Sequence, residues 1–277
     1  MFRDMLVVVD ETEECIVRAR TAAELAARWR AHLTGVFLTS DFLRQYMAAD
    51  GLSFLPPDTV EQVLSDHAKA IDAASETARQ RLEAAAGETG AKIDFMKIGG
   101  DNPENLIACT RRTDLTIMPL SARACLSEHA VAAARVVLAS GGPALILPPQ
   151  GYAPPVGKRV LVAWNGKREA ARALRDAWPL IAEADEVHVL AVSPQSEAGP
   201  DGMLQRYLER HGCKANLIVD PGPDETAAEV IERNIAEYDA DLLVMGLFGH
   251  SRLQELVLGG VSRHVLSRPP IPVFVSH

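Results

Sequence analysis

Leu242-Leu243-Val244-Met245 is a short apolar run, and Gly246-Leu247-Phe248-Gly249 follows it directly. The run is typical of a buried strand, and the residues beyond the glycines have a helical pattern. Glycine at such a junction lets the backbone approach a ligand, because no Cβ is in the way. The N-terminus of the following helix offers unpaired N–H groups, which suit a phosphate. The stretch therefore predicts a strand–loop–helix unit that binds a nucleotide or, in the simpler interpretation, a turn marked by glycines.

The spacing of the glycines distinguishes this stretch from two common phosphate-binding loops. Gly259 follows Gly249 after nine residues and Gly260 comes next, which gives G-x2-G-x9-G followed by a small residue. A Walker A loop needs Gly-Lys-Ser or Gly-Lys-Thr, and neither occurs in the chain. The pattern also differs from the G-x-G-x-x-G of dinucleotide-binding domains.

The composition is that of a globular protein, and the net charge argues against two classes of binding partner. The 277 residues are 48% hydrophobic and 23% charged, enough for one large domain or two of ordinary size. The net charge of −9 argues against nucleic acid or an anionic membrane as the main partner, since both attract basic surfaces. No signal segment and no apolar run of 18 residues is present, so we expect a cytoplasmic protein.

Cysteine and histidine give no metal-ligand pattern. The four cysteines lie in helical or strand-like patterns without C-x-x-C spacing, and we expect them to be reduced and mostly buried. His250 and His264 flank the glycine pattern, but no cysteine or carboxylate ligand set accompanies them. No metal site is therefore predicted.

The order of predicted elements occurs twice along the chain. Short apolar runs alternate with helical patterns, which is typical of βαβ units in a parallel sheet. A strand and an Ala/Arg-rich helix open each half, at 5–10 and 13–31 and again at 160–165 and 168–182.

The two halves also correspond at their ends. The fourth strand is predicted at 114–118 and again at 241–245, and the last strand at 144–147 and 273–275. The first half is longer, mainly through a helical pattern from Thr59 to Ala86. Residues 150–155 form a short proline-containing linker. We therefore predict two domains, 1–149 and 156–277.

These landmarks in both halves, together with the glycine pattern, resemble the tandem two-domain type of the universal stress protein family. The resemblance covers nearly the whole chain and is weakest over 41–86. It implies an α/β fold in which each domain is a five-stranded parallel sheet of order 3-2-1-4-5 with helices on both faces. In such a sheet the ligand lies at the carboxyl ends of strands 1 and 4. For the second half, these ends are the residues around Asn165 and those after Met245.

The resemblance extends to the ATP-binding motif of the family, with departures. Gly246 and Gly249 match the first two motif glycines, and Gly259 matches the third. The next residue is usually Ser or Thr in the family and is Gly260 here, so a phosphate-binding hydroxyl is missing. Ser262, two residues further on, is the candidate substitute.

The position in the first strand that is commonly Asp in the family is Asn165, whose amide can bond a ribose hydroxyl or an adenine edge without charge. Ser251, Arg252 and Arg263 are placed to meet phosphate oxygens or to lie on a solvated helix face. The implied cofactor is ATP, with or without Mg²⁺. The predicted cofactor-binding residues are Asn165, Gly246, Gly249, His250, Ser251, Arg252, Gly259, Gly260, Val261 and Ser262.

The first half keeps Asp10 but lacks the glycines. From Pro119 through Ala139 the chain contains no glycine, so the corresponding site is predicted to be degenerate and empty of triphosphate. The acidic run Asp10–Glu14 would repel phosphate, or it starts a helix with Thr12 near its N-cap.

The sequence favours binding over catalysis. No acidic pair near the glycines makes a clear magnesium site, and no nucleophile has a partner base. We expect a non-catalytic adenine-nucleotide-binding module that regulates a stress response through an unknown protein partner. One alternative is a protein-interaction module that needs no nucleotide. Another is a slow ATPase or autophosphorylating enzyme with Ser251 or Ser262 as acceptor.

The last strand of each half is an apolar sheet edge, which is an aggregation hazard unless it is paired. We predict that 144–147 and 273–275 pair antiparallel and make an internal pseudo-two-fold dimer. A homodimer of whole chains stays open, with 41–86 as an additional surface.

Overall fold

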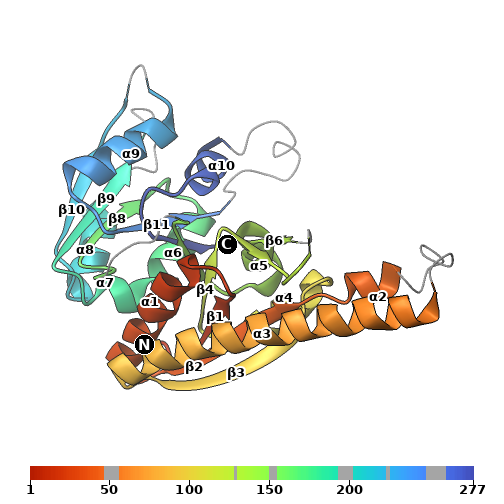
Figure 1. Cartoon of the computed structure of the whole chain (residues 1–277). Coiled ribbons are helices and arrows are strands. Elements are labelled where there is room, and N and C mark those ends of the chain that lie inside the picture. The colour runs from red at the N-terminus through yellow and green to blue at the C-terminus, as the bar shows by residue number, and fades with distance from the viewer. Residues whose placement is uncertain (47–55, 128–129, 150–154, 193–201, 223–224, 248–259) are drawn as a thin grey trace. The chain divides into compact units, whose positions relative to one another are not determined.

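The structure is a computed structural model that describes residues 1–46, 56–127, 130–149, 155–192, 202–222, 225–247 and 260–277 (Figure 1). Its contacts divide the chain into two compact units. The N-terminal unit comprises Arg3–Val136, and the C-terminal unit comprises Val137–His277 together with Met1–Phe2. No helix in the described ranges is long and apolar enough to cross a membrane.

The N-terminal unit is built on four parallel strands in the order β4-β1-β2-β3. Its elements are β1 (Asp4–Val9), α1 (Glu14–Trp29), β2 (His32–Thr39), α2 (Phe42–Tyr46), α3 (Pro57–Thr89), β3 (Lys92–Gly99), α4 (Pro103–Thr110), β4 (Leu115–Pro119), β5 (Ser121–Arg123) and β6 (Ala130–Ala132). α5 (Ala133–Ser140) crosses the boundary between the units.

The apolar runs form the central strands because both faces of the sheet are covered. Met5–Val9 of β1 are all at most 2% exposed, which explains an uninterrupted apolar run instead of an alternating one. Helix α3 packs closely on β2 at Gly35, where a Cβ would collide with Leu82. The buried residues of α3 all lie between Ser75 and Ala86, so the additional length of the first half extends this helix at its N-terminal end.

The C-terminal unit contains a parallel sheet in the order β10-β9-β8-β11-β12. Counted along the chain from β8, this order is 3-2-1-4-5, as predicted. Its elements are β7 (Ala144–Leu147), β8 (Arg159–Ala163), α6 (Arg168–Asp176), α7 (Trp178–Ile181), β9 (Glu186–Ala191), α8 (Gly202–Arg210), β10 (Ala215–Val219), α9 (Ala227–Glu237), β11 (Leu242–Gly246), α10 (Gly260–Ser267) and β12 (Val273–Ser276).

Strand β7 adds to this sheet in the opposite direction. It pairs antiparallel with β12, with Phe274 opposite Leu145 and Val273 opposite Ile146. All four side chains are 0% exposed. The predicted antiparallel pairing of the two last strands is therefore confirmed, and it is the reason why the contacts divide the chain before β7. The domain boundary at 149/156 stays a prediction.

Both units begin their sheet with the same device at the amino ends of the strands. The Asp114 carboxylate accepts hydrogen bonds from the backbone N–H groups of Arg3 and Asp4. The Asp241 carboxylate accepts them from Gly157, Lys158 and Arg159. In each unit an aspartate before the fourth strand thus fixes the start of the first strand. Burial raises the pKa of the Asp241 carboxyl, although its backbone hydrogen bonds act in the opposite direction.

Candidate functional site

The carboxyl ends of β8 and β11 are where the chain order of the C-terminal sheet reverses. β8 pairs with β9 on one side and with β11 on the other, with Ala163 opposite Met245 at the last position of the register. Ligands of open parallel sheets bind at such a switch point. Asn165 and Gly246 both lie there, as the sequence predicted, because each follows or ends one of the two strands.

Asn165 is exposed and shapes the turn into α6. Its Oδ1 accepts a hydrogen bond of 3.0 Å from the backbone N–H of Lys167. Gly166 between them has φ of +70°, a conformation that favours glycine. The amide oxygen is therefore used by the turn, while the Nδ2 group, which is not part of that bond, is the donor that Asn165 can offer to a ligand.

Gly246 is explained by packing between the strand and the neighbouring helix. A Cβ at this position would lie 2.5 Å from the carbonyl carbon of Glu169 and 2.7 Å from the backbone N of Ala170. Both contacts are with the backbone at the start of α6, which cannot rotate away as a side chain can. Gly246 therefore lets the first turn of α6 lie directly on the end of β11.

Leu247 is held by the end of β12, a feature that the sequence did not predict. Its backbone N–H donates to the Ser276 carbonyl (2.8 Å), and its own carbonyl oxygen lies 2.9 Å from Nδ1 of His277. The Leu247 side chain is 0% exposed. A single histidine after the last strand belongs to no motif, so only the fold brings it to the site.

Half of the predicted cofactor-binding residues lie outside the described residues. These are Gly249, His250, Ser251, Arg252 and Gly259. The described chain resumes at α10, whose first residue, Gly260, is exposed. No atom of the described residues lies within 4 Å of the position that its Cβ would take. Val261 is half-buried, and Ser262 is buried.

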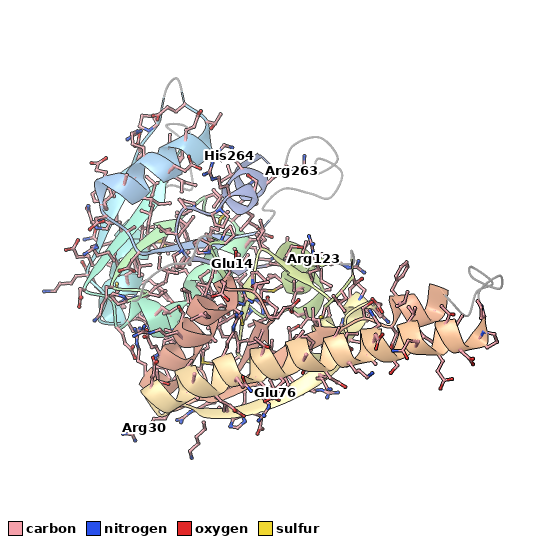
Figure 2. The ribbon with its side chains drawn as sticks, in the orientation of Figure 1. Glu14, Arg30, Glu76, Arg123, Arg263 and His264 are labelled. Atoms are coloured by element: carbon pink, nitrogen blue, oxygen red, sulfur yellow. The ribbon has the colours of Figure 1, made fainter. Side chains whose placement is uncertain are left out.

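Among the described residues, His264 of helix α10 contacts Glu232 of α9. His264 Nε2 lies 3.3 Å from Glu232 Oε1. Figure 2 shows His264 and its neighbour Arg263 on α10, and both side chains are exposed. Arg263 is therefore exposed, which is compatible with both of its sequence interpretations.

The corresponding position in the N-terminal unit is occupied by the chain itself. The Asp10 carboxylate accepts from the Thr12 N–H (3.0 Å) and forms an ion pair with the Arg18 guanidinium. Arg18 is 4% exposed, and its Nε also donates to the Val8 carbonyl (2.7 Å). The counter-ion of Asp10 thus comes from α1. The N-cap of α1 is Glu13, without a side-chain cap bond.

A second segment closes over the strand ends of the N-terminal unit. The hairpin of β5 and β6 follows β4, and between these strands the Cys125 N–H donates to the Leu38 carbonyl of β2 (2.8 Å). Ala124 packs against Gly100. A Cβ added at Gly100 would lie only 2.7 Å from the Cβ of Ala124. Burial, with the nearby Glu11 and Asp10 carboxylates, raises the pKa of the Cys125 thiol to about 12, so the thiol is neutral.

The acidic run at this end is partly compensated. Arg81 of α3 contacts the Thr12 carbonyl and lies 2.6 Å from Glu13 Oε1. Glu14, labelled in Figure 2, lies in the first turn of α1. All four cysteines are free, and Cys15, Cys125 and Cys213 are buried, as expected from the sequence.

Comparison with known proteins agrees with this geometry. The model of the universal stress protein family matches residues 224–277. A universal stress protein of Synechocystis sp. is 30% identical over 145 residues, which are 50% of this chain and 48% of that protein. The match thus spans about half the length of this curated relative.

Two solved structures have the same fold over almost the whole chain. A universal stress protein of Archaeoglobus fulgidus superposes with a TM-score of 0.70 at 20% identity, covering 99% of this chain and 97% of its own. A putative universal stress protein of Pseudomonas aeruginosa superposes with a TM-score of 0.59 at 18% identity, covering 99% and 93%. At these identities the superpositions establish the fold alone. The sequence matches show that residues 224–277 fit the model of the universal stress protein family and that half of the chain is similar to one curated member.

Proposed function

We propose that the chain binds one adenine nucleotide, ATP with or without Mg²⁺, in its C-terminal domain and does not turn it over. Occupancy of this site regulates a stress response by changing the contacts with a protein partner. The β7–β12 pairing makes the internal pseudo-dimer of the tandem protein, and the cytoplasm is the proposed location.

The observation that carries this proposal is the difference between the two switch points. In the N-terminal unit, Arg18 pairs with the Asp10 carboxylate after β1, and the Cys125 N–H bonds the Leu38 carbonyl of β2, so these polar groups are already occupied. In the C-terminal unit Asn165 is exposed, and the first turn of α10 starts at the exposed Gly260. Because the first turn of a helix has unpaired N–H groups, it supports phosphate binding after the glycine pattern. The motif glycines that match the family complete the argument.

The described residues favour binding over phosphoryl transfer. Asp241, the acid that precedes the motif, is at the amino end of β11 and accepts hydrogen bonds from three backbone N–H groups. Glu255, inside the motif, lies outside the described residues. Ser262, one of two acceptors considered for autophosphorylation, is 8% exposed. A slow ATPase is therefore the weaker alternative.

The first experiment is to denature the purified protein and analyse the released small molecules by chromatography. Calorimetric titration with ATP then gives the stoichiometry, and we expect one site per chain. The matched variants are Gly249→Val, in the motif, and Gly87→Val, at a helix position with no atom within 4 Å of the added Cβ. Gly249→Val should abolish binding because its side chain intrudes on the phosphate space, and Gly87→Val should bind normally.

The departures at Asn165 and Gly260 favour a second candidate, a protein-interaction module that binds no nucleotide. No released nucleotide and no heat of binding would support it. Two equivalent sites, or unchanged affinity in a folded Gly249→Val variant, would contradict the proposal of one C-terminal site. ATP consumed in a single-turnover assay with magnesium would contradict the non-catalytic part alone.

A further inference from the structure

The end of β12 forms a frame around the backbone of Leu247. Both backbone polar groups of Leu247 contact this frame, the N–H through Ser276 and the carbonyl through His277. Leu247 is the first residue after β11, so it is where the chain leaves the sheet toward the motif. These two contacts therefore hold the backbone of the last described residue before the rest of the motif.

The frame is itself fixed. Ser276 Oγ donates to Asp176 Oδ2 (2.5 Å), and the same oxygen accepts from Arg172 Nε (3.3 Å), both on α6. One residue earlier in the strand, Val275 pairs with Ala144 of β7. His277 thus follows a residue that is bonded on both its backbone and its side chain.

The chemistry of the contact assigns the tautomer of His277. A carbonyl oxygen can only accept a hydrogen bond, so Nδ1 of the imidazole carries the proton and donates. Protonation of the other ring nitrogen gives a cation that still donates from Nδ1. Both this tautomer and the imidazolium cation can therefore donate to the Leu247 carbonyl.

We infer that His277 is a positioning residue of the nucleotide site, an inference that rests on the proposed function. Leu247 is the last described residue before the rest of the motif, and the contacts at its N–H and at its carbonyl oxygen hold its backbone in place. Gly246 just before it is fixed against α6 by the close backbone contact. The imidazole of His277 is then the side chain that fixes the carbonyl group of Leu247.

The test uses two variants of similar shape. In His277→Asn the amide nitrogen can occupy the place of Nδ1 and donate, whereas in His277→Asp the same place holds a carboxylate oxygen that only accepts. The matched control is His211→Asp. The ring nitrogen of His211 also contacts a backbone carbonyl, that of Tyr207 at 2.8 Å, but on α8.

Two measurements are made on each full-length variant, beside a thermal melt that checks the fold. The first is hydrogen exchange of the Leu247 amide without nucleotide, and the second is ATP affinity by calorimetry. We expect His277→Asp to speed the exchange and to weaken ATP binding by about fivefold or more, as for the loss of one hydrogen bond. His277→Asn and His211→Asp should stay within about twofold of the parent protein.

The two claims fail separately. If the parent protein binds no ATP, the proposed function is wrong, and the exchange of the Leu247 amide still decides whether His277 holds the backbone of Leu247. Unchanged exchange and affinity in His277→Asp would overturn the inference. It would also be overturned if His277→Asn were as impaired as His277→Asp, because the donor would then be irrelevant.

Discussion

At the scale of single residues, two glycines of one motif have different physical reasons. A Cβ at Gly246 would lie 2.5 Å from the backbone of α6, while a Cβ at Gly260 would have no atom of the described residues within 4 Å. Substitution should therefore destabilise the fold at Gly246 and leave it unchanged at Gly260, although both glycines belong to the same sequence motif.

Gly246→Ala should destabilise the protein. The added methyl group meets the backbone of Glu169 and Ala170, so strand and helix must separate, and overpacking of this kind costs about 1–3 kcal/mol. Urea unfolding measures the change in the free energy of unfolding. Gly87→Ala, on an open face of α3, is the control and should not lower the stability. Equal stability of Gly246→Ala and the parent protein would show that the close packing is not real.

Gly260→Ser should strengthen ATP binding under the proposed function. In the part of the chain that the structure describes, no atom lies within 4 Å of the new Cβ, and the hydroxyl restores the group that the family usually has at this place. One additional hydrogen bond to a charged phosphate corresponds to about a tenfold gain in affinity. Gly260→Ala has the same effect on the backbone without the hydroxyl, so calorimetry should show no such gain for it. Equal affinities of the two variants would argue against phosphate at this position.

At the scale of elements, Asp220 connects the end of β10 to α9. Its carboxylate accepts from Asn234 Nδ2 (2.9 Å) and lies 2.8 Å from the Arg233 guanidinium. The Asn234 amide, followed by Arg233 and the Gly222 N–H, lowers the pKa of Asp220 although partial burial opposes this.

This shift predicts a pH dependence for the connection. A carboxyl whose pKa is lowered by folding adds stability above its unfolded pKa, about 3.9, and loses it as the pH falls through the lower, folded value. The stability difference between the parent protein and Asp220→Asn should therefore shrink below about pH 4. Urea unfolding at pH 7, 4 and 2.5 measures it. A difference that stays constant over this range would contradict the assigned cause.

Most elements, but not all, could be predicted from the sequence. The central strands have uninterrupted apolar runs such as Met5–Val9, and burial on both faces makes these runs recognisable. The β5–β6 hairpin escaped prediction because Ser121–Arg123 and Ala130–Ala132 are too short to show a period. The hairpin depends instead on the backbone hydrogen bond from Cys125 to Leu38, two residues that are 87 positions apart in the sequence.

The same reason limits the prediction of the candidate site. Asn165 and Gly246 follow strand patterns and were found at the switch point. His277 could not be found, because its contact with Leu247 exists only once β11 and β12 pair. Five predicted site residues lie outside the described residues, and their roles stay predictions.

At the scale of the whole molecule, the antiparallel pair of β7 and β12 joins the last strand of the first half of the sequence to the last strand of the second half. Phe274 and Leu145 are directly opposite and fully buried. Cross-strand pairs of this kind couple by about 0.2–1 kcal/mol.

A double-mutant cycle tests this pairing. We expect Phe274→Leu and Leu145→Ala to be non-additive by about 0.5 kcal/mol or more, because each removes a contact of the other. Phe274→Leu combined with Leu82→Ala, in the N-terminal unit, is the control and should be additive. Additive effects for both combinations would show that β7 and β12 do not pack as described.

The ion pair of Asp10 with Arg18 has a consequence for how the chain responds to metabolite levels. A free ligand stabilises the folded form by an amount that grows with its concentration. Arg18 belongs to the same chain as Asp10, so its effective concentration at Asp10 does not change with the composition of the solution. Under the proposed function only the C-terminal half then gains resistance to unfolding as ATP accumulates, and the N-terminal half is an internal reference whose stability stays constant.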